Sequence, residues 1–135
     1  MQSHTRALIA ASAYSVITGK KAAGLYDHAL GEHRRIAAEC RGNRVQGVDG
    51  DRSATFGGTL PELYDDGDKA FISLEIEGSG ARGYDRGTQG HYTVEVADPV
   101  IRVYDYGAAS WFAFEVQLAD GAAPPSVEKF PAAPK

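Results

Sequence analysis

The chain has 135 residues, of which 43% are hydrophobic and 24% are charged, and its formal net charge is −4. This length fits one domain, and the composition is that of an ordinary soluble protein rather than a disordered or membrane-spanning one. The mild acidity argues against nucleic acid as a partner, because broad nucleic-acid binding needs a basic surface. The sequence contains no apolar run of about 18 residues, so we expect no membrane-spanning helix.

The first residues are the least regular part of the chain. We expect residues 1–12 to form an N-terminal arm that is either frayed or a short helix. Tyr14, Val16 and Thr18 alternate with polar or small residues and are predicted to form the second strand of a truncated hairpin. The apolar stretch 7–16 is short and has no basic region beyond Arg6, so we expect no secretory signal.

Residues 13–118 are dominated by a repeat of about twenty residues. Two irregular copies open at Val48-Asp49 and, earlier, at Tyr26-Asp27. Three regular copies begin Tyr-Asp-x-Gly, at Tyr64, Tyr84 and Tyr104. Every second position of the strand that follows is apolar: Ile72, Leu74, Ile76, Tyr92, Val94, Val96, Phe112, Phe114 and Val116. This alternation predicts half-buried strands with these side chains on the inner face.

The turns predict how the strands are connected. Asp-x-Gly is typical of a hairpin turn, since Asp accepts hydrogen bonds from nearby amides and Gly adopts positive φ. With short turns at both ends, we expect an all-β antiparallel meander of about 10–11 short strands. A closed or nearly closed barrel would remove its exposed edges, and a β-sandwich and a hairpin solenoid are the alternatives. The segment 119–135 is rich in proline and alanine and is predicted to be a disordered tail.

Strand parity places the repeated tyrosines on the outer face of the sheet, with an arginine two residues earlier in two copies. Exposed aromatic rings can stack on sugars, on bases or on another protein. The alternative is that the rings cover their neighbours on adjacent strands and fix the register. The candidate ligand-binding residues are Tyr26, Tyr64, Tyr84, Tyr104, Arg82, Arg102 and Trp111.

An aspartate stands at each turn of one end of the meander, so all five would gather around one opening: Asp27, Asp49, Asp65, Asp85 and Asp105. Clustered carboxylates are potential ligands for calcium or for basic groups. We favour a simpler interpretation, in which each aspartate caps its own turn and the ring as a whole is solvated. The sequence therefore predicts no bound metal and no cofactor.

Glutamates occupy one outward position of four copies: Glu39, Glu75, Glu95 and Glu115. These glutamates could be interpreted as catalytic carboxylates, but the strand alternation predicts that their side chains point outward, which argues against a catalytic role. Glu75 and Arg82 are seven residues apart across a short turn, as are Glu95 and Arg102. This spacing suits cross-strand ion pairs, so we expect these glutamates to be structural.

Two further groups have reactive residue types. His28, Glu32 and His33 share one long turn but lack the regular spacing of a zinc site. Cys40 is the only cysteine, which excludes an intramolecular disulfide, and we expect a buried, inert thiol in a cytoplasmic protein. No phosphate-binding loop, nucleophile elbow or metalloprotease motif is present.

The sequence favours a non-enzymatic binding or protein-interaction module that uses the outer Tyr/Arg row or the rim of Asp-x-Gly loops. The first alternative is a carrier that holds a small apolar ligand inside the barrel. The second is an enzyme with its site in the loop 27–35, where the repeat is most irregular. Expected partners are a protein, a carbohydrate or a small molecule, with no nucleic acid and no membrane, and a homo-oligomer could form through an unpaired edge strand.

Overall fold

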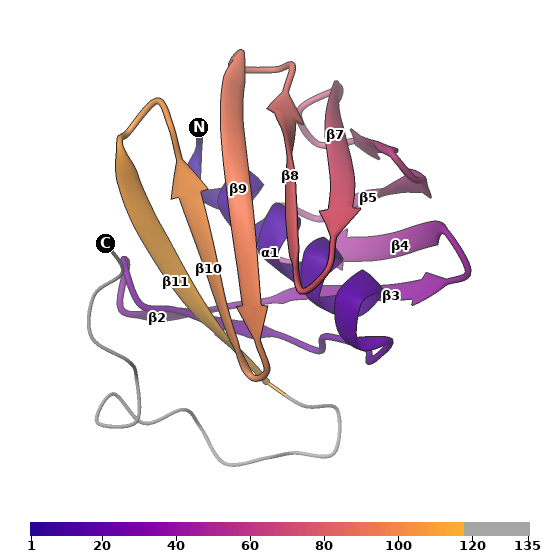
Figure 1. Cartoon of the computed structure of the whole chain (residues 1–135), viewed down its shortest axis with the longest axis horizontal. Coiled ribbons are helices and arrows are strands. Elements are labelled where there is room, and N and C mark those ends of the chain that lie inside the picture. Colours follow the sequence, from indigo (N-terminus) through magenta and orange to yellow (C-terminus); the bar gives the residue numbers. More distant parts are fainter. Residues whose placement is uncertain (118–135) are drawn as a thin grey trace.

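The elements follow one another as α1 (Ser3–Thr18), β1 (Leu25–Asp27), β2 (Glu32–Arg34), β3 (Ile36–Arg41), β4 (Arg44–Asp49), β5 (Ala54–Thr59), β6 (Glu62–Asp65), β7 (Ala70–Glu77), β8 (Gly80–Asp85), β9 (Gly90–Ala97), β10 (Val100–Asp105) and β11 (Ser110–Val116). The strands form one antiparallel sheet that curls into a nearly closed barrel around the helix (Figure 1). The computed structural model describes residues 1–117, and the predicted tail 119–135 lies outside these residues. The single antiparallel sheet and its nearly closed shape confirm the predicted all-β meander and barrel.

The predicted apolar positions build most of the inner face of the barrel, although Ile76, near the end of β7, is 36% exposed. In sheet order the strands lie β2-β1-β11-β10-β9-β8-β7-β6-β5-β4-β3, so the chain meanders from β3 to β11 and β1 closes against β11. Leu74, Val94 and Phe114 are at most 2% exposed. Alternate residues of β10 point outward, as the burial of Ile101 and Val103 between partly exposed neighbours shows. The predicted register thus places equivalent positions on equivalent sides of the sheet.

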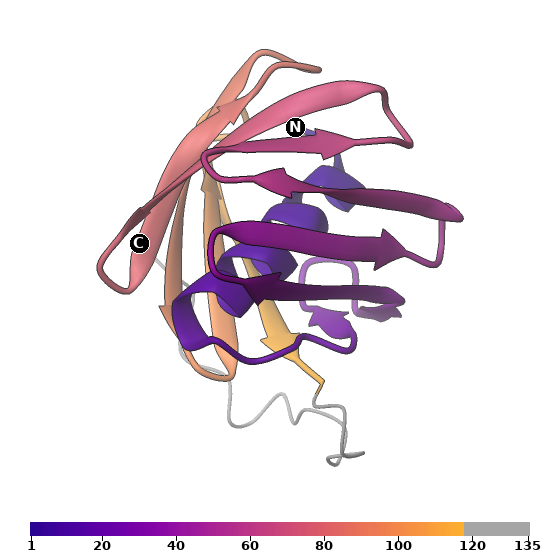
Figure 2. The same ribbon diagram turned by 90° about the vertical axis from the view of Figure 1, so that its right-hand side faces the viewer.

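The helix α1 lies inside the barrel, which the sequence interpretation did not foresee. Figure 2 shows α1 enclosed between β3–β5 and the later strands, and α1 contacts β1, β3, β4 and β7 to β11. Residues 7–15 are all buried, and Gly19 ends the helix with φ +72°. The short helix expected as one alternative for residues 1–12 is present but extends to Thr18, so the strand predicted at Tyr14, Val16 and Thr18 is wrong. A helix buried on every side has no amphipathic pattern to reveal it.

The barrel closes imperfectly between β2 and β3. These two strands are the edges of the sheet, and only Arg35 separates them in the chain. The segment after α1 covers part of the β3 edge, because Ala22 and Ala38 exchange two backbone hydrogen bonds at 2.9 and 3.0 Å. Gly24 and Gln117 tie the same segment to the end of β11. Within residues 1–117, no helix combines the length and the apolar character needed to cross a bilayer.

Candidate functional site

The predicted tyrosines lie on the outer face, and each one is paired with an aromatic or histidine ring on the strand beyond its turn. The ring centroids are 4.9 Å apart for Tyr26 and His33, 4.8 Å for Tyr64 and Phe71, 4.6 Å for Tyr84 and His91, and 5.2 Å for Tyr104 and Trp111. The rings meet at 55–72° rather than in parallel stacks. We call these four pairs the aromatic row. Edge-to-face pairs of this kind add to sheet stability, so the register-fixing interpretation is supported.

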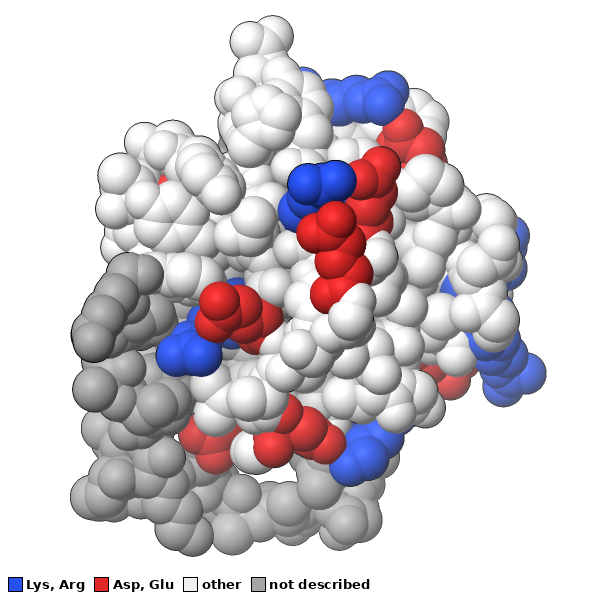
Figure 3. Space-filling model, in the orientation of Figure 1, with Lys and Arg blue, Asp and Glu red and all other residues white. Residues whose placement is uncertain are grey.

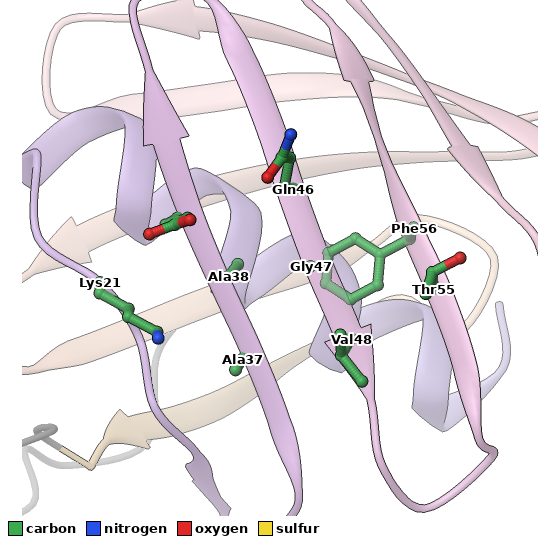
Figure 4. Close-up of a pocket in the computed structure, with 9 residues that line it drawn as sticks. Lys21, Ala37, Ala38, Gln46, Gly47, Val48, Thr55 and Phe56 are labelled. Atoms are coloured by element: carbon green, nitrogen blue, oxygen red, sulfur yellow. The ribbon is translucent and has the colours of Figure 1, made fainter.

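The Val48 hairpin interrupts the aromatic row. Val48 and Thr55 stand opposite each other where the other four hairpins carry two rings. A hollow of about 410 Å³ opens here over β3–β5, with Ala37 in its lining (Figure 4). Gly47 leaves space for the ring of Phe56, since a Cβ at Gly47 would lie 2.1 Å from that ring. Small side chains, rather than a functional motif, thus account for this hollow.

A groove of about 570 Å³ lies on the outer face of β7–β9, extends to the turn after β10 and is the strongest candidate binding site. Tyr84 and His91 line it from neighbouring strands, and Tyr106, which is 55% exposed, lines it from the turn after β10. Arg82 and Glu75 supply the charged part of the lining. The groove therefore combines three rings with one basic and one acidic side chain, the mixture found where proteins hold polar ligands.

The backbone can be close-packed beneath this groove only because residue 83 is glycine. A Cβ at Gly83 would lie 1.9 Å from the carbonyl oxygen of Ser73 and 2.6 Å from the hydroxyl of Tyr92. That hydroxyl donates a hydrogen bond of 2.6 Å to the same carbonyl. The close approach of β7 and the Tyr92 ring beneath the groove therefore depends on the missing side chain at residue 83.

The predicted glutamate–arginine pairs are present beside the groove. Arg82 lies 3.7 Å from Glu75 and 3.4 Å from Glu77, and Arg102 donates a hydrogen bond of 3.0 Å to Glu95. Arg82 and its partners are more than half exposed, so each pair adds only a few tenths of a kcal/mol up to about 1 kcal/mol. Figure 3 shows acidic and basic side chains in small mixed groups on this face, separated by uncharged surface.

The structure divides the predicted binding residues among three places. Tyr84 and Arg82 share the groove, and Tyr104 is linked to it because its ring lies 4.8 Å from that of Tyr106. Trp111 and Arg102 lie on the next hairpin, opposite Tyr104 and Glu95. Tyr26 and Tyr64 belong to hairpins outside the groove.

Sequence reasoning named Trp111 but missed the rings that accompany the other three tyrosines, although the sequence contains a signal for them. Seven residues after each repeated tyrosine stands His33, Phe71, His91 or Trp111. In a hairpin with this turn length, position seven lies directly opposite the tyrosine, as the pairs Tyr84↔His91 and Tyr104↔Trp111 show. An aromatic column on the outer face could therefore have been predicted.

The aspartates cap their turns as predicted, but the ring is not solvated. Each aspartate accepts a hydrogen bond of 2.9–3.1 Å from the amide two residues on. All five residues are only 0–3% exposed: Asp27, Asp49, Asp65, Asp85 and Asp105. The prediction of a solvated ring is wrong because these positions have the inner parity, and the helix end and the turns cover them.

Basic groups neutralise four of the five buried aspartates, whereas Asp85 accepts a hydrogen bond from the hydroxyl of Thr88 instead. Arg52 donates to Asp49 at 2.7 Å and to Asp65 at 3.1 Å, and Arg6, on the first turns of α1, donates to Asp105 at 3.1 Å. The helix begins at this end of the barrel, so the positive end of its dipole faces the carboxylates. The ring is therefore an internal ion network rather than an open acidic rim.

The pKa values of two aspartates of the ring are shifted in opposite directions. Burial raises the pKa of Asp27 above its usual range, although two turn amides and Arg34 act in the other direction. Burial also acts to raise the pKa of Asp105, but the amide of Ala108, the amino group of Met1 and Arg6 together hold that pKa below its usual range. Two turns whose strands are separated only by β11 thus differ electrostatically, although both begin with a buried aspartate.

The remaining candidates from the sequence are used in packing. The rings of His28 and His33 both meet Tyr26 edge-on, at 4.8 and 4.9 Å, so they do not converge with Glu32 as ligands. Cys40 is half-buried, its Sγ lies 3.2 Å from the carbonyl oxygen of Gly42, and burial raises the pKa of its thiol. A thiol in this state is a poor nucleophile.

The interior of the barrel is filled. Leu8, Ile9 and Tyr14 of α1 are fully buried among the inward side chains of the strands. The volume that a carrier would need for an apolar ligand is therefore occupied by the protein's own helix. No protein-family model, curated protein or solved structure matches the chain, so its function has to be inferred from the surface just described.

Proposed function

We propose that the protein is a non-enzymatic binding module that holds a carbohydrate in the groove on β7–β9. The observation that carries the proposal is the convergence of Tyr84, His91 and Tyr106 on one hollow that Arg82 and Glu75 also line. Sugar rings present apolar C–H faces and polar hydroxyl edges. Aromatic faces suit the former, and charged side chains that both donate and accept suit the latter.

The symmetry of the outer face supports binding rather than catalysis. Similar ring pairs occur on four hairpins, and the charged residues of the groove are exposed and paired with one another. Catalysis needs an asymmetric arrangement of acid, base and orienting group in a site that excludes water. In the loop 27–35, which was the enzymatic alternative, the two histidines pack on Tyr26 and Arg34 lies 3.7 Å from Asp27.

A glycan array tests the proposal directly. The wild-type protein should bind a defined set of glycans, and Tyr84→Ala and Tyr106→Ala should each abolish binding to that set. Tyr64→Ala is the matched control, because Tyr64 has the same position in its hairpin and lies outside the groove. Absence of glycan binding by the wild-type protein would refute the carbohydrate proposal.

Contact with another protein is the second candidate, and the extent of the aromatic row favours it. The row continues well beyond the groove, and Phe71 is 49% exposed. Tyrosine, tryptophan and arginine are the residues that most often dominate protein interfaces. For a protein partner found on a protein array, Tyr64→Ala and Tyr84→Ala should weaken binding together, whereas a groove ligand should respond only to Tyr84→Ala.

We also propose that the protein acts in the cytoplasm, without nucleic acid or membrane as partner. The lone thiol of Cys40 is compatible with a reducing compartment, and the net charge of −4 disfavours polyanions. Cell fractionation with an antibody against the native chain would test the location.

A further inference from the structure

Three side chains that could bind a metal ion meet at the Asp-turn end of the barrel. His4 comes from the first turn of α1, Asp65 ends β6, and Asp68 lies in the turn before β7. One imidazole nitrogen and one oxygen from each carboxylate all lie within 4.8 Å of one another. Nε2 of His4 is already 2.7 Å from Oδ2 of Asp68.

One of these carboxylates has an oxygen without a partner. Asp65 is 1% exposed, and its Oδ1 accepts hydrogen bonds from the amide of Gly67 and from Arg52. Among the described residues, Oδ2 of Asp65 is buried and accepts no hydrogen bond. A buried carboxylate oxygen left unsatisfied is costly, so this atom points to a missing ligand that carries positive charge.

Arg52 holds the two carboxylates by their other oxygens. It donates to Oδ1 of Asp65 at 3.1 Å and lies 3.4 Å from Oδ1 of Asp68, which leaves both Oδ2 atoms free of the guanidinium. Hydrogen bonds of this kind orient carboxylates that bind metals. Here the arginine therefore supports the proposed ligands and does not occupy the place of the ion.

The local charge leaves room for a divalent cation. Asp49, Asp65 and Asp68 carry three negative charges. Arg52 contacts all three and contributes only one positive charge. With the neutral imidazole that metal binding requires, the group has a net charge of −2. A divalent ion would neutralise this group and provide a partner for Oδ2 of Asp65.

We propose that His4, Asp65 and Asp68 form a binding site for a divalent transition-metal ion of the zinc type. Ligand atoms about 2.1 Å from a tetrahedral ion lie about 3.4 Å apart. The 2.7 Å contact between His4 and Asp68 would therefore open by about 0.7 Å, and donors up to 4.8 Å apart would approach by up to about 1.4 Å. An imidazole nitrogen with two carboxylate oxygens suits Zn²⁺ better than Ca²⁺, which prefers oxygen alone. Asp68 is 33% exposed, so the ion enters from solvent on that side and keeps water as a further ligand.

Calorimetric titration of the untagged, EDTA-treated protein with Zn²⁺ tests this site. We expect one Zn²⁺ per chain, with binding at least about tenfold weaker in His4→Gln and in Asp68→Asn. His33→Gln is the control, because His33 is an exposed histidine on β2 that should leave the affinity unchanged. Asp65 is left intact because it also caps its turn.

Thermal melting provides a second measurement. Because the ion would join the start of α1 to the turn before β7, Zn²⁺ should raise the Tm of the wild-type protein and of His33→Gln but not that of His4→Gln. The proposal is overturned if the wild-type protein binds no Zn²⁺ or if His4→Gln binds it as tightly as the wild type. A preference for Ca²⁺ over Zn²⁺ that persists in His4→Gln would also overturn it.

Discussion

Substitution of Arg52 is the strongest test of the internal ion network, because this one side chain donates hydrogen bonds to two buried aspartates. Its guanidinium donates to Oδ2 of Asp49 at 2.7 Å and to Oδ1 of Asp65 at 3.1 Å, and both aspartates are 1% exposed. Burial acts to lower the pKa of Arg52, but its bonds to the two aspartates raise that pKa above the usual value. The arginine therefore stays charged at every pH at which the protein is handled.

Arg52→Met would keep much of the aliphatic packing and remove the charge. Each of the two lost charge-assisted hydrogen bonds contributes about 1.5–3 kcal/mol, and the partner carboxylates would be left buried without a counterion. We therefore expect the free energy of unfolding at pH 7 to fall by about 3–5 kcal/mol. Urea denaturation followed by the fluorescence of Trp111, the only tryptophan, and by circular dichroism would measure the loss.

Arg82→Met is the matched control, because Arg82 also has two acidic partners but is 59% exposed. The control should lose no more than about 1 kcal/mol, since surface ion pairs contribute little. The reasoning would be refuted by a loss in Arg52→Met no larger than that in Arg82→Met. Such a result would mean that the buried carboxylates are satisfied without the arginine.

Three further predictions concern other parts of the barrel. Tyr14→Phe removes the 2.8 Å hydrogen bond to Asp98, whose second oxygen still accepts from a lysine, and should lower the unfolding free energy by about 1 kcal/mol in urea. Gly83→Ala places a Cβ against a backbone oxygen and should cost about 3 kcal/mol or more by thermal melting, whereas Gly90→Ala, with its nearest atom at 3.7 Å, should change stability by less than about 0.5 kcal/mol. The pKa of Asp105 lies below its usual range, so its contribution is present above its unfolded pKa of about 3.9 and is lost as the pH falls through the folded pKa. Asp105→Asn should therefore cost stability at pH 7 and progressively less in acid, and a loss independent of pH would contradict this assignment.

The sheet could be predicted because its inner positions alternate strictly with polar ones. Leu74, Val94 and Phe114 have equivalent positions in three copies, and the Asp-x-Gly turns fix which strands are neighbours. A slip of one residue would turn these side chains to solvent, so the pattern determines the register. Short turns then leave the meander as the simplest topology.

The same reasoning allowed a short helix only within residues 1–12 and could not find its full length or its place inside the barrel. Tyr14, Val16 and Thr18 repeat every second residue, which resembles a strand, and residues 7–15 are buried on every side and so lack a polar face. Two weaker signals were present: the segment is rich in alanine, the best helix former, and Gly19 follows it at a typical C-terminal cap position. Only the enclosing strands explain why a helix of so little amphipathic character is stable.

The candidate site was predicted in part. The outer placement of Tyr84 and Arg82 was correct, because strand parity alone determines it. The burial of the aspartates was not predicted, because their counterions come from positions with no periodicity, such as Arg6 and Arg52. Contacts between residues 99 positions apart, as for Arg6 and Asp105, depend on the closed fold rather than on any local pattern.

The position of α1 also constrains the order in which this molecule can be assembled. During synthesis the helix leaves the ribosome before every strand that will surround it, and β1 must wait for β11, its partner in the ladder. Until the final hairpin docks, a nascent chain exposes the apolar surface of α1 and an unpaired strand edge. Pairing over such long sequence separations is slow. Completion of the core should therefore coincide with the arrival of β11, and newly made chains would benefit from a chaperone until then.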